Sequence, residues 1–329
     1  MSEELIVVLT SGHHAAAERV DDRSLEELIF ASTSAAISMA GLTPDQVDAV
    51  VISGNDQTDG RIISCMVTVG AAAGVGKNVT TIASGPEHAF TYAVMRLLAG
   101  QGRNVLVVGW SKPSESVEPE HAELVSADPF YVRPIGMTRQ IAAALQASVH
   151  AAPAEAGTDY LAWPLVAEAG GGHSDGVCAL ILEARDSADR RPGAVVRGMG
   201  WAMDRYELGD RDDLIAGGFD SALQQATKQA GPSFGPVESV DAFAVGPSNE
   251  RRIVERVVAR IGSPDTAMHS SQDELNPDFA AGLFAIWRAA RRVMPDAQPQ
   301  PVARAAAVAT LGFAAQGTTV VLLSNATEV

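Results

Sequence analysis

Cysteine is almost absent from this sequence, and its scarcity argues against two classes of protein. The 329 residues contain two cysteines, Cys65 and Cys178, and neither belongs to a Cys-x-x-Cys or cysteine–histidine cluster. We therefore expect no disulfide framework and no bound metal. Both thiols lie among apolar residues, so we expect them to be small buried side chains.

Positive charge is also scarce. The chain has 24 lysines and arginines against 40 aspartates and glutamates, which gives a formal net charge of -16 at pH 7. This sign argues against general binding to nucleic acid or to an anionic membrane. A phosphate-bearing ligand remains compatible, because a few local cations would hold it. The candidates for that role are Lys77, Arg103, Arg133 and Arg139.

Long apolar runs are missing as well. No stretch is apolar for the length of a membrane span, and the N-terminal MSEELIVVLTSG lacks the basic segment that begins a signal peptide. We therefore expect a cytoplasmic protein that does not contact membranes. With 47% hydrophobic residues and 30 glycines, the chain is typical of a soluble α/β protein with two domains or one two-part core.

The clearest local pattern covers residues 79–110, VTTIASGPEHAFTYAVMRLLAGQGRNVLVVGW. An apolar run ends at Ser84, Gly85 and Pro86, which predicts a strand followed at once by a helix, with Ser84 or Gly85 as the N-cap. Apolar residues then recur at helical spacing up to Gly100, and NVLVV predicts a central parallel strand. A strand that leads into a helix N-terminus can hold an anionic or reactive group there.

Similar patterns fill the rest of the chain. Apolar periodicity and turn residues predict further helices and strands. The expected helices are 24–42, 214–230 and 276–292, and the expected strands are 5–9, 47–53, 175–182, 194–200, 240–245, 305–310 and 317–324.

One helix-to-strand unit occurs twice. Residues 226–245 repeat residues 36–52, because in both a helix ends at Ala-Gly and the next strand opens with Val-Asp-Ala. Such repetition indicates an internal duplication of βαβ units. We predict an N-terminal half at residues 1–190 and a C-terminal half at 191–329, with a shared site between them. The excursion at about 111–170 is typical of a lid that covers a substrate.

Four segments, in this order, resemble the thiolase superfamily, which includes thiolases, the sterol-carrier-protein-x-type thiolases and ketoacyl synthase III. They are VDAVVIS at 47–53, IASGPEHAF at 82–90, SDGVCALIL at 174–182 and TLGFAAQGTTVVLL at 310–323. The resemblance covers nearly the whole chain. It implies the duplicated α/β thiolase fold, with five layers in the order αβαβα.

The resemblance also locates the family's catalytic positions. Acyl transfer in this family needs a cysteine thiolate at a helix N-terminus and a histidine base. The thiolase cysteine pattern falls on Ile82, and that of ketoacyl synthase III falls on Ala83. Asn276 replaces the thiolase histidine, Gly246 replaces that of ketoacyl synthase III, and Thr310 replaces the second thiolase cysteine. The resemblance therefore implies a member that lacks the cysteine and histidine machinery.

A few polar groups near these positions are candidates for other chemistry. Ser84 could be a substitute nucleophile, although a role as N-cap explains it better. His88 follows about one helical turn later and could face the site or pack in the central helix. Asn249 and Asn276 could carry protons. His173, His269, Asp273, Glu274, Tyr131 and Tyr206 are further candidates that loop or surface positions explain equally well.

The resemblance implies two alternative functions. In the first, the chain is a pseudoenzyme, a non-catalytic subunit that forms a homo- or hetero-dimer with a thiolase-like subunit through residues 55–77. A catalytically complete thiolase or ketosynthase-like chain, or a zinc-ribbon and OB-fold protein, would be its partner in a complex that acts on acyl-CoA or acyl-carrier thioesters. No tightly bound cofactor is expected.

In the second function, the chain is an enzyme of altered chemistry on a CoA or carrier-bound thioester. The reaction would be retro-aldol carbon–carbon cleavage or acyl transfer without a covalent intermediate. Backbone N–H groups near Ala83 and Gly312 could still form an oxyanion hole. A pocket that opens to Ala83 would favour this function, whereas a pocket filled by Ile82, Phe279 or Phe313 would count against it.

Overall fold

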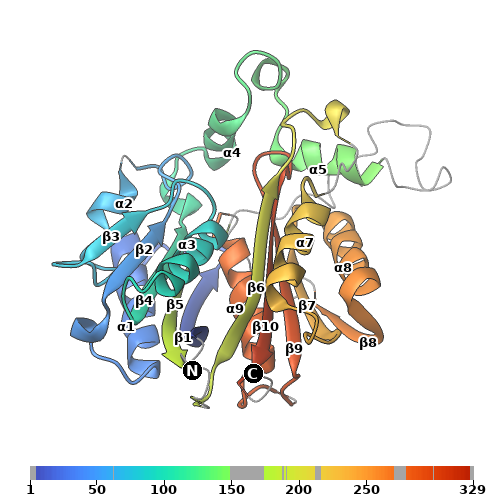
Figure 1. Cartoon of the computed structure of the whole chain (residues 1–329). Helices are drawn as coiled ribbons and strands as arrows, with labels where there is room; N and C mark the ends of the chain where they lie inside the picture. The colour runs from blue at the N-terminus through green and yellow to red at the C-terminus, as the bar shows by residue number, and fades with distance from the viewer. Residues whose placement is uncertain are drawn as a thin grey trace.

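The computed structural model describes residues 5–61, 63–148, 174–186, 189, 191–211, 216–269, 279–298 and 300–326. Strands and helices are interspersed along the chain (Figure 1). The strands are β1 (Leu5–Ala17), β2 (Ala49–Ser53), β3 (Asn78–Thr81), β4 (Asn104–Ser111), β5 (Asp175–Asp186), β6 (Ala194–Met203), β7 (Val237–Phe243), β8 (Gly262–His269), β9 (Arg304–Leu311) and β10 (Gly317–Asn325). The helices are α1 (Leu25–Met39), α2 (Ser64–Val67), α3 (Pro86–Leu98), α4 (Pro119–Glu123), α5 (Arg139–Ser148), α7 (Phe219–Ala230), α8 (Pro247–Ile261) and α9 (Ala281–Val293).

The strand order is repeated. The described strands are hydrogen-bonded in the order β3-β2-β4-β5-β1-β6-β10-β9-β7-β8. Counted outward from the middle, the first set runs β1-β5-β4-β2-β3 and the second runs β6-β10-β9-β7-β8, so in each set the first strand of the chain is followed by the fifth, fourth, second and third. Strands at equivalent places also pair in the same sense, antiparallel for the first two pairs and parallel for the last two. An internal duplication produces such an order, although the boundary at residue 190 stays a prediction. The two sets meet at β1 and β6, which pair only at Val8–Val195 and Leu9–Ala194.

Side chains of the central strands alternate between two cores. In β4, Val105 and Val107 belong to one core, and Leu106 and Val108 belong to another. Successive side chains on a strand point to opposite faces, so a strand covered on both sides reads as a continuous apolar run. The sequence NVLVV is therefore a strand buried on both faces, as its composition predicts.

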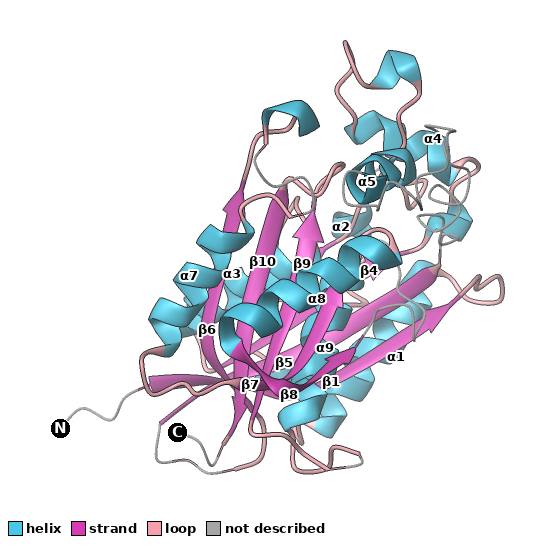
Figure 2. Cartoon of the chain, turned by 90° about the vertical axis from the view of Figure 1, so that its right-hand side faces the viewer, coloured by secondary structure: helices cyan, strands magenta, loops and turns pink. Residues whose placement is uncertain are grey.

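The helices complete five layers (Figure 2). Helix α1 packs on the outer face of the first strand set, and α7 and α8 pack on the outer face of the second. Helices α3 and α9 lie between the sets and share one core with strands of both. The α/β fold class predicted from the sequence is confirmed.

Local signals explain where the first helices begin. Ser24 caps α1, because its Oγ accepts a hydrogen bond from the Glu27 N–H at 3.2 Å while the Glu27 carboxylate accepts from the Ser24 N–H at 2.8 Å. Helix α3 begins at Pro86 with Gly85 as its N-cap.

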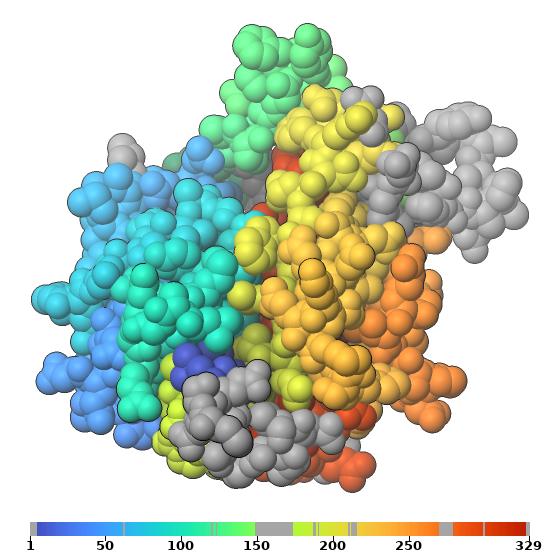
Figure 3. All heavy atoms as spheres, viewed as in Figure 1, coloured from blue at the N-terminus to red at the C-terminus, as the bar shows by residue number. Residues whose placement is uncertain are grey.

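One end of the layered structure is covered by the segment that precedes β5. Helices α4 and α5 lie there, at the top in Figures 1 and 3, above the two strand sets and their helices. Residues 149–170 of the predicted lid lie outside the described residues. Among the helices that the structure describes, none has the length and apolar character to cross a membrane.

Candidate active site

A cavity of about 710 Å³ lies where β2, β4, β7 and β9 end and where α3 and α9 begin. Ligands of open α/β sheets bind at the carboxyl ends of the strands. Ser126 and Arg139 reach the cavity from the segment that covers this end. Apolar side chains form much of its wall, namely Ile63, Met66, Met203, Phe243, Phe279, Leu311 and Phe313.

The turn between β3 and α3 forms one wall of this cavity. Ala83 and Ser84 line it, whereas Ile82 packs against the core between the two strand sets. Phe279 and Phe313 contribute to the wall but leave the space in front of Ala83 open. A cavity that opens to Ala83 is the arrangement expected of an enzyme of altered chemistry.

Thr310 and Gly312 line the cavity at the end of β9. Gly312 has a φ of +90°, and a Cβ atom there would collide with the side chain of Gln316. Glycine is therefore needed for this turn, which carries the Gly312 backbone beside the cavity.

Ser84 and His88 form a hydrogen-bonded pair. The Ser84 Oγ lies 2.9 Å from the His88 Nδ1, and the Ser84 carbonyl accepts a hydrogen bond from the Ser53 hydroxyl at 2.6 Å. Burial lowers the pKa of His88, so the imidazole is neutral at pH 7 and can accept a proton from the serine. The Ser84 side chain does not cap α3, so the N-cap interpretation of this residue is wrong.

Glu87 is buried in the wall of the same cavity. Its side chain is 2% exposed, and its Oε1 has no hydrogen-bond partner among the described residues. The carboxyl occupies space left by Gly85 at the start of α3 and Gly282 at the start of α9, because a Cβ atom at either glycine would collide with it. Burial raises the pKa of Glu87 to about 7, and its own backbone N–H and the positive charge of Arg139 oppose this shift.

Three of the sequence candidates lie apart from the cavity or outside the described residues. Asn249 is buried in α8 and donates from Nδ2 to the carbonyls of Ala143 and Val245, at 3.1 and 3.0 Å. Gly246 is the N-cap of α8 with a φ of +89°. Neither of them lines the cavity. Asn276 lies outside the described residues.

The further candidates that the structure describes do not line the cavity either. Tyr131 is exposed, and Tyr206 packs in a small apolar cluster while its hydroxyl accepts a hydrogen bond from the Asp128 N–H at 2.8 Å. His269 ends β8. The other three, His173, Asp273 and Glu274, lie outside the described residues.

The two cysteines differ in their surroundings. Cys178 is fully buried in the core between the strand sets, as expected, whereas Cys65 is only half-buried and lines the cavity. Burial raises the pKa of Cys65 to about 11 and raises the pKa of Cys178 still further. Both side chains therefore remain protonated thiols at pH 7.

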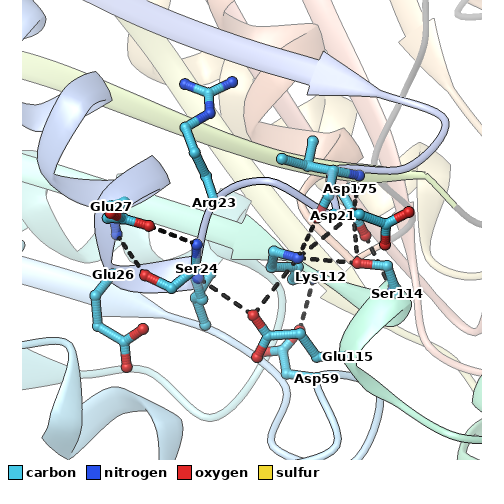
Figure 4. Close-up of polar contacts among 12 residues, drawn as sticks. Asp21, Arg23, Ser24, Glu26, Glu27, Asp59, Lys112, Ser114, Glu115 and Asp175 are labelled. Carbon is cyan, nitrogen blue, oxygen red and sulfur yellow. Dashed lines mark hydrogen bonds and ion pairs between the residues drawn. The ribbon is translucent and has the colours of Figure 1, made fainter.

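Next in the chain to Ser111 and Pro113 of the cavity wall, Lys112 belongs to a buried cluster of charges (Figure 4). Lys112 is 3% exposed and donates from Nζ to the Val20 carbonyl at 2.8 Å and to the Ser114 hydroxyl at 2.9 Å. Its Nζ also lies 3.5 Å from Glu115 and 3.8 Å from Asp175. The cluster joins the end of β4 to the chain segments at the end of β1 and the start of β5.

Asp59 lies next to this cluster. Its carboxylate accepts hydrogen bonds from the Trp110 Nε1 at 3.0 Å and from the Lys112 backbone N–H at 2.8 Å. Burial raises the pKa of Asp59 to about 7, and these two donors oppose the shift. These contacts fix the loop that follows β2, and the neighbouring Thr58 lines the cavity.

Glu87 is not among the candidates that the sequence motifs indicate. An acidic residue in the first turn of a helix is stabilised by the helix dipole, so its presence there does not by itself indicate a site. The available signal was helical spacing, since Phe90 and Val94 follow Glu87 by three and seven residues and belong to the buried face. A carboxyl on the apolar face of a helix is unusual enough to mark a candidate site.

Comparison with known proteins defines the class of fold. No protein-family model matches the chain, and no curated protein matches it in sequence. Among solved structures, the architecture is that of a thiolase-like α/β fold, as the sequence motifs implied.

One solved structure with a similar fold is that of the monomeric SCP2-thiolase-like protein type 1 of Mycobacterium smegmatis. The two superpose with a TM-score of 0.61 and 17% sequence identity, over 97% of this chain and 77% of that protein. At this level of identity the similarity concerns the fold alone.

Proposed function

We propose that this chain is a thiolase-like enzyme of altered chemistry. It binds the acyl part of a CoA or carrier-bound thioester and acts on it without a covalent acyl-enzyme, by retro-aldol cleavage or direct acyl transfer. The observation that carries this proposal is the cavity of about 710 Å³ that reaches Ala83 at the start of α3. A purely structural subunit has no need to keep this space open.

The chemistry of the wall supports the same proposal. The nucleophile positions implied by the resemblance hold Ile82 or Ala83, and the Cys65 thiol is kept protonated by its raised pKa. A thiolate-dependent acyl-enzyme therefore has no residue to form on in the described wall. Apolar side chains such as Met66 and Phe243 suit an acyl chain, and N–H groups near Ala83 and Gly312 would polarise a thioester carbonyl.

Calorimetric titration with butyryl-CoA and with free CoA tests this function. We expect butyryl-CoA to bind more tightly than CoA, because only the thioester places an acyl group in the cavity. Ala83→Phe fills the space beside the turn and is expected to weaken butyryl-CoA binding at least tenfold. The matched control is Ala31→Phe on the exposed face of α1. Absence of binding, or equal binding by the Ala83 variant, contradicts the proposal.

A second function is supported by a separate observation. Ile63, Met66, Val67 and Val75 are large apolar residues that are 48 to 76% exposed, all in the connection between β2 and β3. Exposed apolar residues close together in a chain are typical of an interaction surface. They favour pairing with a thiolase-like subunit whose cysteine and histidine are intact.

Purification from the native host tests the second function. We expect a co-purifying thiolase-like chain that is lost when Met66 and Val75 are both replaced by aspartate. A purified chain that turns over acyl-CoA thioesters alone would show that no such partner is needed for activity.

A further inference from the structure

We propose that Glu87 is the general base and acid of this site, and that it moves a proton at the α-carbon of the bound thioester. This inference rests on the proposed binding of an acyl thioester in the cavity. It assigns the proton transfer to a residue of α3 that neither the sequence motifs nor the fold comparison indicates.

The position of the carboxyl is built into the fold. Glu87 lies in the first turn of α3, and its carboxyl extends between Gly85 and Gly282, at the starts of the two central helices. Any side chain at either glycine would displace it. Two elements far apart in sequence thus provide the space for one carboxyl group beside the cavity.

The hydrogen bonding of this carboxyl is incomplete. A buried carboxyl that only stabilises a fold is normally satisfied by donors, because an unpaired buried polar atom costs about 1–3 kcal/mol. The Oε1 of Glu87 has no hydrogen-bond partner among the described residues, although the residue lines the cavity. The unpaired acceptor is therefore buried in the wall beside the space where the acyl group is proposed to lie.

The charges around Glu87 suit proton transfer in both directions. Burial destabilises the carboxylate, whereas Arg139 across the cavity and the N-termini of α3 and α9 favour it. The opposing effects bring the carboxyl pKa to about 7, so both protonation states are populated near neutral pH. A general base and acid is most effective when its pKa lies near the working pH.

The proton transfer balances without any other reactant. The Glu87 carboxylate takes the proton from the α-carbon, the carbon–hydrogen bond breaks, and its electron pair forms the enolate of the thioester. The enolate oxygen carries the negative charge beside the N–H groups near Ala83 and Gly312. The proton held by the Glu87 carboxyl exchanges with water, and transfer of a water-derived proton from Glu87 back to the α-carbon restores the thioester, so the partial reaction is an exchange of the α-proton with solvent.

Exchange of the α-protons of butyryl-CoA in D₂O, followed by NMR, measures this step directly. We expect the wild-type chain to catalyse exchange and Glu87→Gln to reduce the rate at least 100-fold. The same substitution is expected to change the dissociation constant of butyryl-CoA less than threefold, because the amide keeps the shape of the carboxyl. The matched control is Glu250→Gln, which alters a buried glutamate in the first turn of α8, away from the cavity.

A second variant keeps the test independent of the folding of Glu87→Gln. Gly282→Ala retains the carboxyl but displaces it, and we expect at least a tenfold loss of exchange. Exchange that persists in Glu87→Gln, or that is lost in Ser84→Ala but not in Glu87→Gln, overturns the inference. Binding of butyryl-CoA without exchange by the wild-type chain overturns it while the proposed binding stands. Absence of binding overturns both.

Discussion

Glu87 and Asp59 are two buried carboxyls near one end of the molecule, and burial raises the pKa of both to about 7. Asp59 accepts hydrogen bonds from Trp110 and from the Lys112 backbone, whereas the Oε1 of Glu87 has no partner among the described residues. Equal pKa values therefore arise in different surroundings. The hydrogen-bond partners, rather than the pKa, separate a carboxyl that holds a loop from one whose buried acceptor has no partner among the described residues.

The largest effect is expected at the charge cluster beside Asp59. Replacing Lys112 with methionine removes the cation that lies near Glu115 and Asp175, and leaves the fully buried Asp175 without a positive partner within the cluster. Removal of one member of a buried ion pair costs about 3–5 kcal/mol. Urea denaturation should show this loss in the free energy of unfolding.

Lys228→Met, on the exposed face of α7, is the control for that experiment and should change stability by less than about 0.5 kcal/mol. A loss below about 1 kcal/mol in Lys112→Met would mean that the cluster does not stabilise the loop around Asp59. The contrast between the two carboxyls would then disappear.

The next effect is the pH dependence of stability. The folded pKa of Glu87 is about 7, above its ordinary value of 4.5, so the folded state holds the proton more tightly than the unfolded state. Its contribution to stability is therefore fully present below about pH 4.5 and is lost as the pH rises through about 7. This difference between the folded and unfolded pKa corresponds to roughly 3 kcal/mol in the free energy of unfolding. Urea denaturation between pH 5 and pH 8.5 should show a smaller decline for Glu87→Gln than for the wild type.

Asp59 also makes the free energy of unfolding fall as the pH rises, because its pKa is raised from 3.8 to about 7 in the folded state. Arg61 and Glu115 are the charges next to it. The Glu87→Gln variant therefore retains part of the decline with pH. An identical decline in the variant and the wild type would show that Glu87 has an ordinary pKa in the folded protein.

The smallest effect separates the two residues most directly. At pH 3 both carboxyls are protonated in the folded state and mostly protonated in the unfolded state, so Asp59→Asn and Glu87→Gln are compared almost without a change of charge. The amide of asparagine must turn a donor towards either Trp110 or the Lys112 N–H, which costs about 1–3 kcal/mol. Glu87→Gln loses no partner at Oε1 and should change the free energy of unfolding by less than about 0.5 kcal/mol. Equal losses in urea denaturation would contradict the distinction.

Much of the fold could be predicted from the sequence, because its strands and helices carry local signals. The run at residues 104–108 is a strand buried on both faces, as its continuous apolar composition indicates. Strand β1 extends to Ala17, well beyond the predicted end at residue 9, because it pairs along its length with β5. Strand β8 contains Pro264 and Asp265 and was not predicted, since only its pairing with β7 makes it a strand.

The candidate site was predictable in part. The Ser84–His88 contact joins residues four apart on one turn of a helix start, so their sequence spacing already brings them near each other. The space for Glu87 depends on Gly282, which belongs to α9, a helix far from α3 in the sequence. No local pattern reports a contact of that kind. The roles of Asn249 and Asn276 stay predictions.

The pairing of β1 also bears on how the chain folds during its synthesis. Leu5 pairs with Asp186 and Ala17 pairs with Asp175, so β5 separates β1 from the rest of the first strand set. A ribosome that adds about 5–20 residues per second takes roughly ten seconds or more to complete β5 after β1 has emerged. During that interval β1 lacks its main partner, and the first five-stranded unit closes only when more than half of the chain has been made.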